Sequence, residues 1–226
     1  AGSGRVPAAL NNIVGLKPSL GSLSSSGVVP ACRTIDTVSV LAMTVEDAYN
    51  VFTILNEYDE KDSYSKSFKK LPLSLPQHPI KIGIPDKSSI RFFNDNFQSE
   101  SFDRNINKLK LNDFEITPIN FEPFYEIAQL LYEGSWVAER YTVIEDLLKK
   151  NSKAIHNVTR QIIKKAENFS AADTFEDYYK LSELKRKVKP ILSSVDMLCV
   201  PSIPTFYSVN DLINDPFTPY SNLGTY

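Results

Sequence analysis

Ser3 lies between two glycines at the start of the chain, in the stretch Ala1-Gly2-Ser3-Gly4-Arg5. Neighbours this small leave the serine hydroxyl uncrowded, and glycine lets backbone N–H groups approach a reacting atom closely. A serine that takes part in acyl transfer needs both features, an accessible oxygen and backbone donors for the developing oxyanion. The same composition is typical of a flexible loop, so these five residues alone leave both interpretations open.

A second candidate site is formed by Tyr132 and Arg140, which are eight residues apart in a region with helical character. If residues 125–150 form one helix, the two side chains lie about 80° apart in azimuth, close to one face. Arginine offers a planar fork of donors and tyrosine adds another, a combination that suits a small carboxylate.

Gly134 stands between these two residues. A glycine inside a helix costs about 1 kcal/mol, so its presence indicates a packing or ligand demand at this point. The periodicity also allows a plainer interpretation, in which Tyr132 and Trp136 pack in the core. Arg140 is then solvated or paired with a neighbouring glutamate.

The elements that must position these residues follow from local patterns. Residues 1–36 are rich in Gly, Ser and Pro and predict turns and short strands, and residues 57–78 predict a polar loop. Alternation of apolar and polar residues predicts strands at 37–41, 79–84 and 114–119, and a short buried strand at 197–201. A helix is predicted from Thr44, with a buried apolar stripe formed by Ala48, Val51, Phe52 and Leu55. Further helices are predicted over 102–111 and over most of 122–194 with breaks near Asn151 and Phe169–Ser170, followed by a loop at 207–226. A strand, a helix and a strand in succession at 79–119 predict an α/β layer.

The bulk composition excludes several classes of protein. The 226 residues carry a net charge of −2, which gives no indication of nucleic acid or an anionic membrane as a partner. No apolar run is long enough for a membrane span. Two histidines and two well-separated cysteines provide no metal-ligand cluster and no disulfide framework.

The residues after Ser3 carry a family resemblance. The Gly2–Leu10 stretch runs into Ile13–Ser19, Gly27–Pro30, Asp36 and Ala42–Ala48. This order of motifs resembles the second half of the signature of the amidase signature family of serine hydrolases. The resemblance implies an α/β fold with a central mixed β-sheet flanked by helices, of which this chain would be a fragment lacking strands at both ends.

The same resemblance implies a site. Ser3 would be the nucleophile and the backbone N–H of Gly2 an oxyanion donor. Its activators, a serine with a cis peptide bond and a lysine acting as base, would lie upstream of this chain. Arg5, which cannot act as a base, would anchor the nucleophile loop through a carboxylate. No metal or organic cofactor is implied.

A closer resemblance concerns substrate choice. The stretch from Tyr132 to Tyr141 is similar to that of allophanate hydrolases, as are residues 27–33, 201–205 and 223–226. It implies that Tyr132 and Arg140 hold the substrate carboxylate. The chain would then be the C-terminal part of an amidase domain, spanning residues 1–226 with a helical subregion at about 122–194.

The resemblance further implies cytoplasmic hydrolysis of allophanate in urea degradation, with release of ammonia. In fungi this domain is commonly fused to a urea carboxylase, and biotin and ATP would be needed only by that partner. The fragment alone would be inactive, and a homodimer is left open. Two alternatives remain: another amidase, such as the glutaminase subunit of a tRNA amidotransferase, and a non-catalytic domain.

Overall fold

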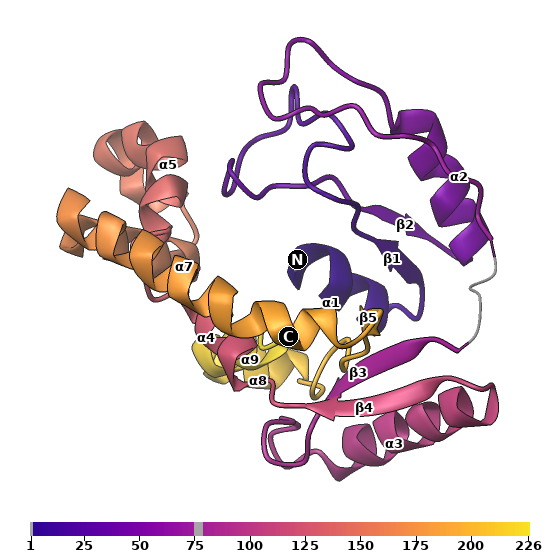
Figure 1. The fold of residues 1–226 in the computed structure, drawn as a ribbon. Coiled ribbons are helices and arrows are strands. Elements are labelled where there is room, and N and C mark those ends of the chain that lie inside the picture. Colours follow the sequence, from indigo (N-terminus) through magenta and orange to yellow (C-terminus); the bar gives the residue numbers. More distant parts are fainter. Residues whose placement is uncertain (1, 75–78) are drawn as a thin grey trace. The chain divides into compact units, whose positions relative to one another are not determined.

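The computed structural model describes residues 2–74 and 79–226 and divides the chain into two compact units, Ala1–Leu75 and Pro76–Tyr226. Figure 1 colours the chain from the first unit, in indigo and purple, to the end of the second, in yellow. Each unit has its own strands and helices. The mixed α/β class predicted from the sequence is confirmed.

The first unit contains a two-stranded antiparallel sheet and two helices. The elements are α1 (Gly2–Leu10), β1 (Val14–Leu16), β2 (Val40–Ala42) and α2 (Val45–Leu55). Gly15 in β1 faces Leu41 in β2 in the register of the sheet. Strand β2 begins at Val40, three residues later than the sequence predicted.

Helix α1 was missed by the sequence analysis, which predicted only turns and short strands over residues 1–36. Gly2, Gly4 and Pro7 all have poor helix propensity, and Pro7 lies inside the helix, where it cannot donate to the preceding turn. The helix forms because it packs against β1 and β2, with Gly4 and Ala8 buried. Tertiary packing therefore overrides local propensity here.

The predicted start of α2 is confirmed, but its predicted buried face is not. The Thr44 hydroxyl accepts a hydrogen bond from the Asp47 backbone N–H at 3.0 Å, as an N-cap does. Of the predicted apolar stripe only Ala48 is buried, while Val51 is 41% and Leu55 50% exposed. Two strands of three residues each are too small to cover a whole helix face.

The polar loop predicted at 57–78 is confirmed over its described part, residues 57–74, and residues 75–78 lie outside the described residues. The carboxylate of Asp59 accepts from the Ser24 hydroxyl at 2.6 Å, and that of Asp62 from the Ser25 N–H at 2.7 Å. These hydrogen bonds lower the pKa of both carboxyl groups. The loop is therefore tied to the serine run at 24–26.

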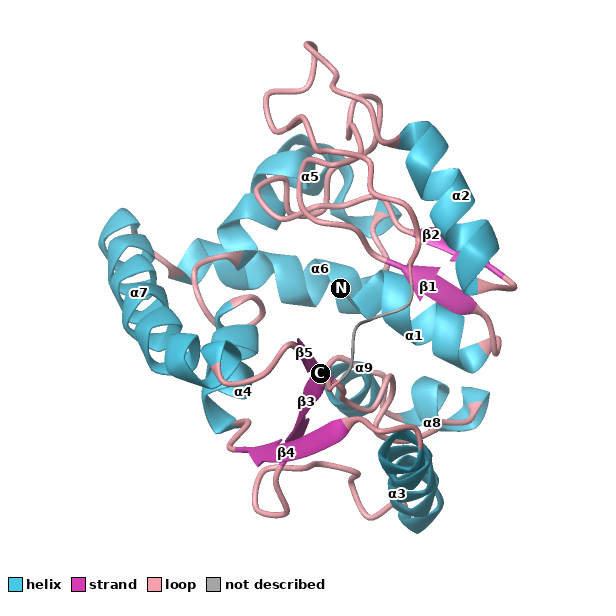
Figure 2. Ribbon diagram, turned by 45° about the vertical axis from the view of Figure 1, so that its right-hand side comes forward, coloured by secondary structure: helices cyan, strands magenta, loops and turns pink. Residues whose placement is uncertain are grey.

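The second unit is built on a three-stranded parallel sheet with strand order β4-β3-β5. Its strands are β3 (Lys81–Pro85), β4 (Glu115–Ile119) and β5 (Met197–Leu198). Its α-helices are α3 (Asn96–Leu111), α4 (Glu122–Leu130), α5 (Val137–Asn151), α6 (Asn157–Lys164), α7 (Ala171–Ser193), α8 (Val209–Asn214) and α9 (Phe217–Leu223), with 3₁₀ turns at Ser152–Ala154 and Lys165–Asn168. Helix α3 runs along β4 (Figure 1), and Figure 2 shows β3 and β4 side by side.

Several predicted elements of the second unit are confirmed. Strand β3 is the central strand, with Ile82 only 2% exposed and Gly83 on the opposite face also buried, so the burial does not alternate as the sequence does. It pairs in parallel with β4, which confirms the strand–helix–strand layer. The helical breaks near Asn151 and Phe169–Ser170 are confirmed. Ser170 begins α7 through a capping box with Asp173.

Other predictions for this unit were wrong. Helix α3 begins six residues early because Asp95 caps it, its carboxylate accepting from the Gln98 N–H. Strand β5 is short, and Met197 is 46% exposed because β5 pairs only with β3 and lies at the edge of the sheet. The loop predicted at 207–226 contains α8 and α9. Its missed signal is the Ser208–Asp211 capping box.

No helix in the described part of the chain is both long and apolar enough to cross a membrane.

Candidate active site

Ser3 lies in the first turn of α1, and its side chain is exposed. The first backbone N–H groups of a helix have no acceptor within the helix, and they carry its positive end. Such donors suit a negatively charged oxygen, as the oxyanion role predicted for Gly2 requires. A Cβ atom added at Gly2 would meet no other group of the described residues within 4 Å, so Gly2 is not crowded by packing.

The helix that carries Ser3 is packed tightly through two glycines. A Cβ atom on Gly4 would lie 2.6 Å from the Ser39 hydroxyl oxygen. A Cβ on Gly15, in β1, would lie 2.8 Å both from the Ala8 Cβ and from the Gly4 carbonyl oxygen. These distances are shorter than real contacts, so α1 rests on the strand at backbone level.

This packing predicts that Gly15→Ala displaces the start of α1. We expect a loss of about 1–3 kcal/mol in the free energy of unfolding, because the clash at the Gly4 carbonyl is with backbone. Catalytic turnover should fall at least about tenfold, since small shifts of a reacting group are costly. Thermal melting and steady-state kinetics measure the two effects. Gly2→Ala, which meets open space, is the stability control, and an unchanged melting temperature for Gly15→Ala would contradict the packing argument.

The first unit contains a lysine, Lys17, and two serines, Ser24 and Ser25, that could be mistaken for the base and the second serine of the family. Their side chains make structural contacts. The ammonium group of Lys17 donates to the Pro18 carbonyl at 3.3 Å, and the hydroxyls of Ser24 and Ser25 donate to Asp59 and Asp62. Arg5 is half-buried in α1, and its role as a loop anchor stays a prediction.

Tyr132 and Arg140 meet in the second unit, but not on one helix. The continuous helix predicted over 125–150 is wrong: α4 ends at Leu130, residues 131–136 form a bend, and α5 begins at Val137. Tyr132 lies in the bend and Arg140 in the first turn of α5. The Arg140 guanidinium carbon nevertheless lies 4.8 Å from the centre of the Tyr132 ring, a cation–π contact.

The packing demand predicted at Gly134 is confirmed, and its source is α7. A Cβ atom on Gly134 would lie 2.7 Å from a carboxylate oxygen of Asp177 and 2.8 Å from the Leu130 carbonyl oxygen. The same Asp177 oxygen accepts a hydrogen bond from the Ser135 N–H at 2.6 Å. Only glycine leaves room for this carboxylate at the bend.

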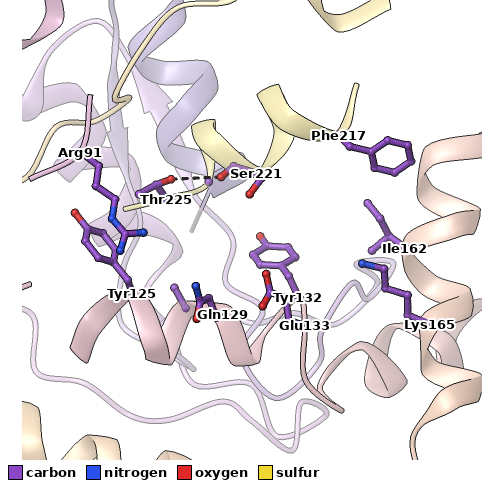
Figure 3. A pocket seen from close by; sticks show the side chains of 12 residues that line it. Arg91, Tyr125, Gln129, Tyr132, Glu133, Ile162, Lys165, Phe217, Ser221 and Thr225 are labelled. Carbon is purple, nitrogen blue, oxygen red and sulfur yellow. Dashed lines mark hydrogen bonds between the residues drawn. The ribbon is translucent and has the colours of Figure 1, made fainter. Parts of the chain in front are cut away.

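A cavity of ≈ 250 Å³ opens beside Tyr132 within the second unit. Figure 3 shows Arg91 and Tyr125 at one end of it, Lys165 at the other, and Tyr132 with Glu133 between them. Its remaining lining residues are Ala128, Gln129, Ile162, Phe217, Ser221, Gly224 and Thr225. Arg91 follows β3 and Tyr125 follows β4, so this end of the cavity lies at the carboxyl edge of the parallel sheet, where α/β proteins bind ligands.

Several contacts hold the side chains at the Arg91 end of the cavity. The Arg91 guanidinium carbon lies 3.8 Å from the centre of the Tyr125 ring, and the group pairs with Glu122 at 2.7 Å. The Tyr125 hydroxyl donates to the Ser89 carbonyl, and the Tyr226 hydroxyl donates to the Arg91 carbonyl. Burial, with a smaller contribution from Tyr226, raises the pKa of Tyr125, so this phenol stays neutral.

Sequence reasoning missed Arg91 and Lys165 as residues of this cavity. Arg91 could have been found from its place just after a predicted parallel strand. Lys165 comes from a 3₁₀ turn between α6 and α7, and no local pattern indicates what it faces. Among the described residues, no three potential metal ligands lie close enough together to hold an ion.

Comparison with known proteins defines the class. Residues 1–212 match the Amidase family, and the chain belongs to this family. The chain is 38% identical over 229 residues to the urea amidolyase of Saccharomyces cerevisiae, a match that covers all of this chain and 12% of that protein. It is 39% identical to the allophanate hydrolase of Kluyveromyces lactis, with a TM-score of 0.94 over all of this chain and 37% of that one.

A more distant relative comes from the other predicted branch of the family. A glutamyl-tRNA(Gln) amidotransferase component from Orientia tsutsugamushi is 28% identical over 98% of this chain and 51% of its own length. The recognition of the chain as an amidase similar to allophanate hydrolases is thus confirmed. The chain spans about an eighth of the curated urea amidolyases that it matches.

Proposed function

We propose that this chain is part of an enzyme that hydrolyses allophanate with release of ammonia. The observation that carries the proposal is the meeting of Tyr132 and Arg140, whose ring and guanidinium lie 4.8 Å apart. Of the two, Tyr132 lines the cavity. Identity of 38–39% over all of this chain to a segment of a urea amidolyase and of an allophanate hydrolase supports the same substrate.

In this proposal the substrate carboxylate binds to Arg140 and Tyr132. Allophanate is a small anion with little apolar surface, so most of its binding must come from charge-assisted hydrogen bonds. The guanidinium presents donors in a fixed fork that matches a carboxylate, and the phenol adds one donor. This anchoring leaves the terminal amide as the group that reacts.

Ser3 is the nucleophile in the proposed mechanism. A lysine acting through a second serine, which the family resemblance places before Ser3, takes the hydroxyl proton while the oxygen attacks the acyl carbon. The N–H groups at the start of α1, including that of Gly2, hold the oxyanion. Collapse of this intermediate breaks the carbon–nitrogen bond and expels ammonia with the transferred proton. Water then releases N-carboxycarbamate from the serine.

The wider context is also proposed. The domain itself needs no metal or organic cofactor, and it works in the cytoplasm beside a urea carboxylase fused in the same polypeptide. The match to a 12% segment of a much longer urea amidolyase supports such a fusion. Biotin and ATP would then serve only the carboxylation that supplies allophanate. A homodimer stays a prediction.

The test is a comparison of ammonia release by the full-length protein from three substrates. Allophanate carries the carboxylate, biuret replaces it with an uncharged carboxamide, and glutamine is the substrate of the amidotransferase alternative. We expect kcat/KM for allophanate to exceed that for biuret by roughly tenfold or more, the effect of about one charge-assisted hydrogen bond. Preference for glutamine would favour the glutaminase alternative, and no release from any of them would favour a non-catalytic domain.

A further inference from the structure

The bend between α4 and α5 is held by a residue from a distant helix. Helix α5 has no side-chain cap of its own, because Trp136 occupies its N-cap position. Asp177, on α7, instead holds the residue just before the N-cap: its carboxylate accepts a hydrogen bond from the Ser135 N–H at 2.6 Å, across 42 positions of sequence. The negative charge of this carboxylate also interacts favourably with the positive end of the α5 helix dipole.

The contact is built into the packing of the bend. Ser135 is almost fully buried, and the adjoining Gly134 leaves the space that the Asp177 carboxylate occupies. The next residue of α7, Tyr178, packs on the next residue of the bend, with 4.8 Å between the ring centres of Trp136 and Tyr178. Two successive residues of α7 therefore hold two successive residues of the bend.

The bend determines whether Tyr132 and Arg140 can meet. Tyr132 precedes Gly134 and Arg140 follows Ser135, so the direction in which α5 leaves the bend decides how close their side chains lie. Residues 131–136 make only short-range turn hydrogen bonds along the backbone, such as that from the Ala138 N–H to the Ser135 carbonyl at 2.8 Å. Turns of this kind do not by themselves fix the direction of the following helix, so contacts from α7, including the bond from Ser135 to Asp177, help to hold it.

We propose that Asp177 is a positioning residue for carboxylate recognition, acting through the bend and without touching the substrate. The inference rests on the proposed function for its substrate, and on the hydrogen bond to Ser135 for its geometry. Loss of this bond releases α5 from its fixed direction. The cost then falls on binding of the carboxylate at Arg140 and spares chemistry at Ser3.

The experiment uses the full-length protein with Asp177→Ala, Asp177→Asn and, as the matched control, Glu176→Gln. Glu176 is the exposed neighbour on α7, so its replacement removes the same charge without touching the bend. Two quantities are measured for each variant: hydrogen–deuterium exchange in peptides covering residues 131–140, and kcat and KM for allophanate and biuret.

For Asp177→Ala we expect faster exchange over 131–140 and a rise of at least about tenfold in KM for allophanate, with kcat and the biuret kinetics changed much less. Asp177→Asn keeps an acceptor oxygen and should lie between this variant and wild type. Glu176→Gln should match wild type.

The possible failures are distinguishable. Unchanged exchange in Asp177→Ala overturns the proposal, and so does faster exchange with an unchanged KM for allophanate. Equal losses on allophanate and biuret would make Asp177 a purely structural residue and also overturn it. If the wild-type protein does not hydrolyse allophanate, the proposed function fails by itself, while the exchange data still decide whether Asp177 holds the bend.

Discussion

Replacement of Ser3 by alanine is expected to abolish ammonia release from allophanate in the full-length protein. Loss of a serine nucleophile removes the covalent route and leaves only oxyanion stabilisation and substrate binding, so the rate should fall roughly 10⁴- to 10⁶-fold. The fold should be unaffected, because the Ser3 side chain is exposed in the first turn of α1. Steady-state ammonia production and thermal melting measure the two quantities.

Ser19→Ala is the matched control for this variant. Ser19 is also an exposed serine of the first unit, and no side-chain hydrogen bond ties its hydroxyl to the described part of the chain. Its replacement should leave turnover and melting temperature unchanged. Near-normal turnover in Ser3→Ala would overturn the nucleophile assignment, whereas a large drop in its melting temperature would make the loss of activity structural.

At the start of the chain, the sequence motifs predicted the family correctly, whereas helix propensity predicted the local structure wrongly. The glycines around Ser3 allowed both a flexible loop and a nucleophile turn, and local propensity argued against any helix there. In the structure Ser3 lies in the first turn of α1, a helix held by the close contacts of Gly4 and Gly15. Such contacts join residues distant in sequence, and no local pattern encodes them. The order of signature motifs predicted the family correctly because it does not depend on knowing the local conformation.

The proximity of Tyr132 and Arg140 was predicted correctly, but the single helix expected to bring them together was wrong. Tyr132 and Arg140 do meet, but through a bend and not through the periodicity of one helix. Gly134 was the signal of the bend, and it indicated a packing demand without showing its source. That source is Asp177, some forty residues further along the chain, whose contact only the folded structure reveals.

Local signals succeeded where the physical cause is itself local. The Thr44 cap needs only the Asp47 N–H three residues later, and the β-branched residues at 80–84 favour a strand by their own shape, although both faces of β3 carry buried residues. The apolar face of α2 failed because burial depends on what covers a helix. Only contacts beyond the segment decide that, and a periodic pattern cannot supply them.

Arg140→Ala is expected to separate recognition of the carboxylate from general amidase activity. We expect kcat/KM for allophanate to fall roughly tenfold to a hundredfold, which corresponds to the loss of one charge-assisted hydrogen bond of about 1.5–3 kcal/mol. The kinetics with biuret should change little, because its carboxamide carries no charge for the guanidinium to bind. Steady-state assays on both substrates give the comparison.

Two further substitutions and one control sharpen this test. Arg140→Lys should restore only part of the activity, because an ammonium group keeps the charge but lacks the planar fork and stacks less well on the Tyr132 ring. Tyr132→Phe should cost less than Arg140→Ala, since it removes one neutral donor and keeps the ring. Arg186→Ala removes an exposed arginine of α7 and should leave both substrates unaffected. If Arg140→Ala lowers kcat/KM equally for allophanate and biuret, Arg140 supports the fold and does not bind the carboxylate. The assignment of allophanate as substrate then loses the observation that carries it.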